Sequence, residues 1–140
     1  NSARMCRAHR QMFDSLIEQL LKEGEKEKAL KALDYCMEQI PGSTLPHNYA
    51  SSSFVSYYYQ LGQKEKAQQL SDEIGARAED NLRYLNTLNL QQRRSASDEI
   101  TRNLAAIQQL AFAAEKYNIT DYIKYYELMS TYSPLYNSIQ

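Results

Sequence analysis

Apolar residues recur along the chain at the three- and four-residue steps of an α-helix. One series ends at Gly24, and a second series of the same period ends at Pro41. Because proline lacks the N–H that a continuing helix needs, Pro41 is expected to end the second helix. The pattern therefore predicts two antiparallel helices joined by a short turn, built on Phe13, Leu16, Ile17, Leu20 and Leu21, then Ala29, Leu30, Leu33, Cys36, Met37 and Ile40.

The same period predicts a second pair of helices. Pro46 is expected to start the third helix, because a helix leaves its first N–H groups without partners anyway, and Gly62 ends it. The fourth helix begins near Gln63 and continues to about Leu90, although Gly75 weakens it locally. No stretch alternates with a period of two over enough residues to predict a strand.

A third pair of helices follows after the periodicity lapses near Leu90. Ser95 and Asp98 are spaced as in a capping box, which predicts the start of a fifth helix. Asn118 suits the left-handed residue at its end, and Thr120 is expected to cap a sixth helix. The dipeptide Ser133-Pro134 is expected to close the helical region.

One short turn occurs twice, since residues 23–29 (EGEKEKA) return almost unchanged as residues 61–67 (LGQKEKA). An alanine follows five residues after each glycine, at Ala29 and Ala67, and Pro41 lies seventeen residues after Gly24. This arrangement resembles the tetratricopeptide repeat, whose second helix carries a small residue and ends in proline. Glu79 occupies the corresponding proline position of the second copy, which departs from the pattern there.

These observations predict an all-α fold, a tetratricopeptide-like α-α superhelix of about three helical hairpins. A chain of 140 residues is one typical domain that needs neither metal nor disulfide to fold. We interpret the chain as a single helical-repeat domain and as a piece of a longer protein, since it begins with Asn1. The domain is 1–140, and its hairpins are 5–41, 46–90 and 95–132.

A more specific resemblance rests on residues 20–41 (LLKEGEKEKALKALDYCMEQIP), 57–67 (YYYQLGQKEKA) and 102–117 (RNLAAIQQLAFAAEKY). This order is similar to the soluble C-terminal domain of large multi-pass Bacteroidetes membrane proteins related to lipid-linked-sugar glycosyltransferases. The resemblance implies that any catalytic acid belongs to the membrane part, that the parent chain supplies a membrane tether, and that an extracytoplasmic location is favoured over a cytoplasmic one. No segment of this chain is expected to insert into the bilayer.

Charge does not select a partner for this chain. The 16 basic and 17 acidic side chains nearly cancel, so no broad field attracts nucleic acid, and we expect no nucleic-acid partner. Two local basic groups could still contact phosphates, but a charged flank beside a linker is the favoured interpretation. These groups are Arg4, Arg7 and Arg10, then Arg93, Arg94 and Arg102.

The candidate chemistry is weak throughout. Asp14 and Glu18 lie four residues apart on one helix face, but no further participant accompanies them, so we expect no catalytic residues and no enzyme activity in this domain. Cysteines and histidines match no metal-ligand spacing, so we expect neither metal nor cofactor. The residues considered for zinc are Cys6, His9, Cys36 and His47, of which Cys36 lies on an apolar stripe and is expected to be buried.

Tyrosine dominates the aromatic residues, with 12 Tyr, 3 Phe and no Trp. Consecutive Tyr57, Tyr58 and Tyr59 must point in different directions from a helix, and at least one is expected to reach the surface. By analogy with the repeat, first-helix positions would line a concave, partner-binding face. These positions are Gln11, Asp14, Glu18, Leu21, Tyr49, Ser52, Ser56 and Tyr59.

The sequence thus favours a non-catalytic protein-interaction or positioning module whose partner is a protein or peptide. The alternative is an accessory domain that contacts a glycan or a lipid-linked substrate through exposed tyrosines. Both hypotheses leave the oligomeric state open.

Overall fold

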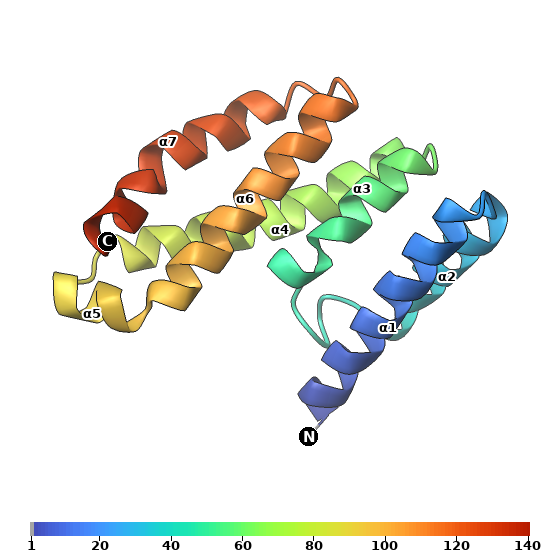
Figure 1. The fold of residues 1–140 in the computed structure, drawn as a ribbon, viewed down its shortest axis with the longest axis horizontal. Coiled ribbons are helices and arrows are strands. Elements are labelled where there is room, and N and C mark those ends of the chain that lie inside the picture. Colours follow the sequence, from blue (N-terminus) through green and yellow to red (C-terminus); the bar gives the residue numbers. More distant parts are fainter. Residues whose placement is uncertain (1) are drawn as a thin grey trace.

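The computed structural model describes residues 2–140, and over this range the chain is helical without any strand (Figure 1). The all-α class expected from the hydrophobic period is confirmed. A 3₁₀ turn, η1 (Tyr49–Ser51), precedes α3. The α-helices are α1 (Ser2–Lys22), α2 (Lys26–Gln39), α3 (Ser52–Gln60), α4 (Lys64–Leu85), α5 (Leu90–Ser95), α6 (Ser97–Lys116) and α7 (Tyr122–Ser138).

Helices that follow one another across a tight turn pack side by side, as α1 with α2, α3 with α4, and α6 with α7. Helix α3 also contacts α1 on one side and α6 on the other, and α4 packs along α6. In Figure 1 the α1–α2 pair and the α6–α7 pair therefore lie on opposite sides of α3 and α4. Buried apolar side chains form one contiguous core from Ile17 in α1 to Leu135 in α7.

The tight turns after α1, α3 and α6 share one backbone geometry. Each contains a residue in the left-handed region, with φ of 76° at Gly24, 75° at Gly62 and 59° at Asn118. At each turn the N–H of this residue donates to the carbonyl three residues back, and the next N–H donates to the carbonyl five residues back. This is the Schellman ending of a helix, and the expectation that Asn118 ends a helix in this way is confirmed.

The two glycine turns are followed by equivalent packing. Ala29 and Ala67 each lie five residues after the glycine and are fully buried. A methyl side chain at this position lets the two helices of a pair approach closely. The third turn departs from this pattern, since the corresponding residue, Ile123, is exposed.

The expected starts of the third and fifth helices are wrong. Pro46 lies in the loop before η1, where Asn48 forms a capping box with Ser51. Ser95 does not cap α6, because its hydroxyl donates to the Gln91 carbonyl inside α5. The capping box of this region lies earlier, where the Asn89 and Gln92 side chains each accept from the other's backbone N–H.

The final helix also differs from expectation at both ends. Helix α7 begins at Tyr122 after Asp121, so Thr120 does not cap it. The helix passes through Pro134 and ends at Ser138. Proline removes a single N–H, and its exposed ring leaves the core undisturbed, while the adjacent Leu135 is fully buried and anchors the last turn.

Gly75 lies in the middle of α4 and permits α7 to pack closely. A Cβ at this position would lie 3.1 Å from the ring of Tyr125. The Tyr125 hydroxyl is 2.6 Å from the Ser71 hydroxyl one turn earlier in α4, and both are buried. The helical propensity lost at Gly75 is therefore offset by the packing of a buried aromatic side chain.

The left-handed turns generate a stability prediction. Gly62→Ala is expected to lower the free energy of unfolding by about 1–2 kcal/mol, because an L side chain is disfavoured at positive φ. Gly62→Asn is expected to cost less, since Asn118 adopts the same conformation. Urea unfolding of the two variants measures the difference, and equal stability of both would contradict the assignment of this turn.

Candidate functional site

Consecutive tyrosines of α3 join the first helix pair to the rest of the chain. The Tyr57 hydroxyl donates to Asp14 of α1, and the Tyr58 hydroxyl donates to Asp34 of α2 at 2.9 Å. Lys66 of α4 lies 3.1 Å from the same Asp34 carboxylate and forms a salt bridge with it. Burial and these hydrogen bonds to carboxylates raise the pKa of both tyrosines, so both hydroxyls remain protonated donors at neutral pH.

The next tyrosine in the chain contacts a different helix. The Tyr59 ring stacks on Tyr117 at the end of α6, with ring centroids 5.2 Å apart. Burial raises the pKa of Tyr59 to about 12. The three tyrosines do point in different directions, and one of them reaches the surface in part, because Tyr57 is half-buried while the other two are buried.

Asp14 carries a half-buried negative charge that neutral groups hold in place. Besides Tyr57, the Ser53 hydroxyl donates to it at 2.9 Å. No Lys or Arg among residues 2–140 forms a salt bridge with Asp14. The carboxylate is thus oriented by hydrogen bonds without being neutralised, and it retains charge for an incoming group.

A pocket of about 270 Å³ opens beside this carboxylate, where α1, η1, α3 and α6 meet. Tyr49 stands at its edge with 43% of its surface exposed. The pocket brings together three of the residues expected on the partner-binding face, Asp14, Tyr49 and Ser52. Its lining is Asp14, Tyr49, Ala50, Ser52, Ser53 and Gln109.

The other expected face residues lie outside this pocket. Glu18 is exposed and forms a salt bridge with Lys22, and Ser56 is half-buried. Gln11 lies one turn before Asp14 and lines a neighbouring pocket. Tyr59 is buried against Tyr117. Ser52 belongs to the Asp14 pocket itself, where it is buried and its hydroxyl donates to the Tyr49 carbonyl at 2.7 Å.

Sequence reasoning did not identify Ser53, Tyr57 or Gln109. Ser53 and Tyr57 are four residues apart, so a helix places both on one face. This spacing was the feature of the sequence that could have indicated a shared partner for the two hydroxyls. Gln109 comes from α6 and reaches the pocket only through tertiary packing. Nothing in the local sequence indicates that contact.

Arg10 is a buried cation, and this contradicts its interpretation as part of an exposed charged flank. Only 5% of its surface is exposed. One terminal nitrogen donates to the carbonyls of Ile40 and Leu45, at 2.7 and 2.9 Å, and the other makes a long contact of 3.5 Å with the Pro46 carbonyl. The side chain therefore ties the loop after α2 to α1.

His47 lies in the same loop and is 1% exposed. Its Nδ1 is 3.1 Å from the Ser51 hydroxyl, while its Nε2 is buried without a hydrogen-bond partner among residues 2–140. Burial, together with the positive charge of Arg10, lowers the pKa of His47 from 6.5 to about 4. The loop is thus built around a neutral imidazole.

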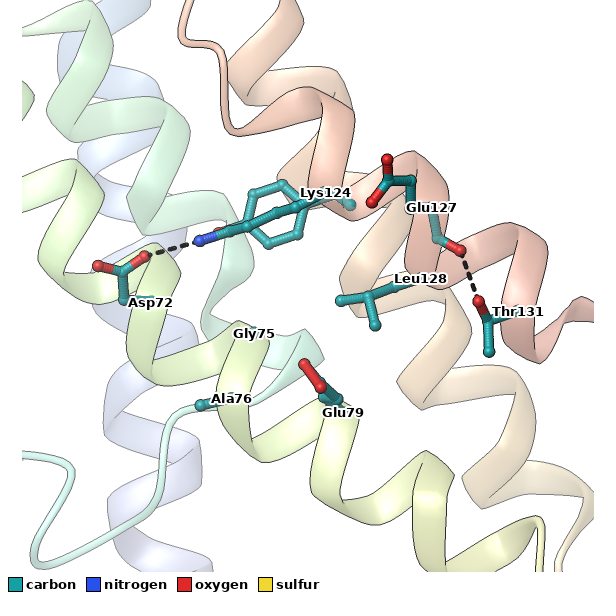
Figure 2. A pocket seen from close by; sticks show the side chains of 9 residues that line it. Asp72, Gly75, Ala76, Glu79, Lys124, Glu127, Leu128 and Thr131 are labelled. Carbon is teal, nitrogen blue, oxygen red and sulfur yellow. Dashed lines mark hydrogen bonds and ion pairs between the residues drawn. The ribbon is translucent and has the colours of Figure 1, made fainter.

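A larger groove of about 530 Å³ lies between α4 and α7. Figure 2 shows Lys124 extending from α7 across this groove to Asp72 of α4, at 3.4 Å. Glu79 on the same wall is paired with Arg83. The charged groups named here already pair with one another, and none of the expected face residues lines the groove, so we do not assign the binding site to it.

No family model, curated protein or solved structure matches the chain. Over residues 2–140, no cluster of His, Cys, Asp and Glu side chains is arranged to hold a metal ion. Within that range, no helix combines the length and apolar character needed to cross a membrane.

Cys36 is fully buried as expected, and burial raises the pKa of its thiol to about 11.

His47 generates a pH prediction. In the unfolded chain His47 binds a proton below about pH 6.5, whereas in the folded chain it binds one only near pH 4. The contribution of His47 to the free energy of unfolding is therefore fully present above pH 6.5 and is lost as the pH falls towards 4. The loss approaches about 3 kcal/mol for a shift of this size. Urea unfolding between pH 7.5 and about pH 4.5 is expected to show this slope in the wild type and to show a smaller slope in His47→Gln.

Exposed His9 provides the matched control, since it is the only other histidine. His9→Gln is expected to keep the wild-type slope. An unchanged slope in His47→Gln would contradict a buried neutral imidazole.

Proposed function

We propose that this chain is a non-catalytic interaction module, of the tetratricopeptide-like repeat type, that binds a segment of a partner protein beside Asp14. The pocket at the junction of α1, η1, α3 and α6 carries the proposal, since it exposes an oriented carboxylate that has no cationic partner in residues 2–140. Repeated Schellman turns after α1, α3 and α6 support the repeat assignment.

The charge of the pocket selects the chemistry of the partner. A half-buried carboxylate with two hydroxyl donors gains most from a Lys or Arg side chain, which forms a charge-assisted hydrogen bond. The exposed ring of Tyr49 at the pocket edge can pack against the aliphatic stem of that side chain. The partner segment is therefore basic, and Gln109, which lines the same pocket, is placed to contact a residue next to its cation.

The proposal extends to the longer protein of which this chain would be a part. A membrane enzyme that uses lipid-linked sugars would carry this module as a soluble domain, and the module would position a partner rather than perform chemistry. The similarity of residues 20–41, 57–67 and 102–117 to the soluble domains of such proteins supports this assignment.

The binding proposal is tested with a displayed library of random peptides selected on the immobilised protein. Enriched peptides are expected to carry Lys or Arg, and Asp14→Asn is expected to weaken their binding about tenfold or more, because it removes the charge but keeps an oxygen that accepts a hydrogen bond. Isothermal titration calorimetry of the enriched peptides measures the change in Kd.

Glu18→Gln is the matched control, because it removes a charge one turn further along α1, outside the pocket. Its Kd is expected to stay within about twofold of the wild type. Selection of peptides without basic residues, or equal effects of the two substitutions, would contradict the proposed site.

A glycan-binding module is the second candidate, and the exposed Tyr49 ring beside a carboxylate is the observation that favours it. Tyrosine packs on sugar rings, and carboxylates accept from sugar hydroxyls. Saturable shifts of the Tyr49 and Gln109 amide signals in an NMR titration with a glycan panel would favour this candidate, and no shift with any glycan would eliminate it.

A further inference from the structure

Next to the Asp14 pocket, the structure gathers arginine side chains from two helices. A pocket of about 150 Å³ lies between α1, the loop before η1, and α4. Arg7 and Arg10 reach it from α1, and Arg77 reaches it from α4, far away in the sequence. The complete lining is Arg7, Arg10, Gln11, Leu45, Pro46, Asn48, Ala50 and Arg77, which contains no Asp or Glu.

Neither Arg7 nor Arg77 forms a salt bridge within residues 2–140. Arg10 contacts three backbone carbonyls, but a guanidinium has five N–H donors, and its Nε has no partner in the described chain. Backbone carbonyls satisfy donors without cancelling the charge.

One carboxylate acts on Arg10 from outside the pocket. Burial lowers the pKa of Arg10, and Glu73, one turn before Arg77 on α4, partly opposes this, while its carboxylate packs against Gly42, where a Cβ would overlap its Oε1. It does not line the pocket. Three like charges that converge on a small, partly enclosed space repel one another, and an anion bound among them removes that cost.

We infer that the pocket of Arg7, Arg10 and Arg77 binds a phosphate group. Guanidinium groups match the geometry of phosphate oxygens through paired N–H donors, and a dianion balances three positive charges better than a carboxylate does. The volume holds the phosphate with a few further atoms. Gln11 and Asn48 supply neutral donors at the rim, and Arg10 forms the fixed base because its contacts with Ile40 and Leu45 already hold it in place.

The site differs in charge from the Asp14 pocket but lies next to it, because Ala50 lines both. Along α1, Arg7 and Gln11 line the basic pocket. Asp14, which lies one turn after Gln11 and two turns after Arg7, lines the acidic pocket. The phosphate site does not require the peptide proposal. Phosphate binding can be lost while peptide binding remains, so each proposal fails separately.

NMR titration with inorganic phosphate at pH 8 tests the inference, with sodium chloride added to keep the ionic strength constant. The amide signals of Gln11, Ala50 and Arg77 are expected to shift saturably. Acetate is expected to bind at least about tenfold more weakly, since it carries one charge instead of two.

Arg77→Gln is the informative variant because Arg77 is exposed and contributes no buried packing, so the protein is expected to keep its fold. Its Kd for phosphate is expected to rise about tenfold. The matched control is Arg83→Gln on the same helix, where the arginine pairs with Glu79 and Asp80 outside the pocket, and its Kd is expected to change less than twofold.

Three results would overturn the inference: shifts no larger than chloride produces, acetate binding as tight as phosphate binding, or an unchanged Kd in Arg77→Gln. Phenyl phosphate identifies the source of the group. Tighter binding of phenyl phosphate than of inorganic phosphate assigns the site to a phosphate ester, and weaker binding assigns it to the free ion.

Discussion

Three consecutive tyrosines of α3 hold the helix pairs of this molecule together. Tyr57 contacts α1, Tyr58 contacts α2, and Tyr59 contacts the end of α6. A helix turns about 100° per residue, so three neighbours reach three different elements. The short central helix thereby sets the positions of the pairs on both of its sides.

Both candidate pockets follow from this arrangement. The acidic pocket forms where Asp14 of α1 comes near η1, α3 and Gln109 of α6, and the basic pocket forms where α1 approaches α4. Hydrogen bonds to Asp14 and the contacts of Arg10 with the loop carbonyls fix α1 in that position. The same polar groups that hold the first pair in place therefore shape the surfaces proposed for binding.

The sequence predicted the fold class well because helix pairs are encoded locally. Apolar spacing identified every helix except the short α5, and the helix ends at Gly24, Gly62 and Asn118 followed from residue type, although a left-handed conformation was expected only at Asn118. The capping residues at helix ends were harder to predict, because a cap depends on which neighbouring side chain forms the hydrogen bond with the free backbone N–H groups. Ser95 lies inside α5, which Asn89 caps, and α6 begins without a side-chain cap, while burial of Leu135 anchors α7 beyond Pro134.

The sites could be predicted only in part. Asp14, Tyr49 and Ser52 were expected on one face, and they line one pocket. Gln109 and Arg77 join the two pockets from distant helices, so no local pattern could identify them. The burial of Arg10 was also beyond the local pattern, because its partners are carbonyls of a loop about thirty residues away, and a backbone carbonyl carries no signature in the sequence.

Native-state hydrogen exchange tests the central role of the α3 tyrosines most directly. The measurement compares the wild type with the double variant Tyr57→Phe and Tyr58→Phe, which keeps the rings and removes the hydroxyls that bind Asp14 and Asp34. In the double variant, amides in α1 and α2 are expected to lose protection while those in α6 and α7 keep it. Equal loss across all helices, or no loss in α1 and α2, would contradict the central role of these tyrosines.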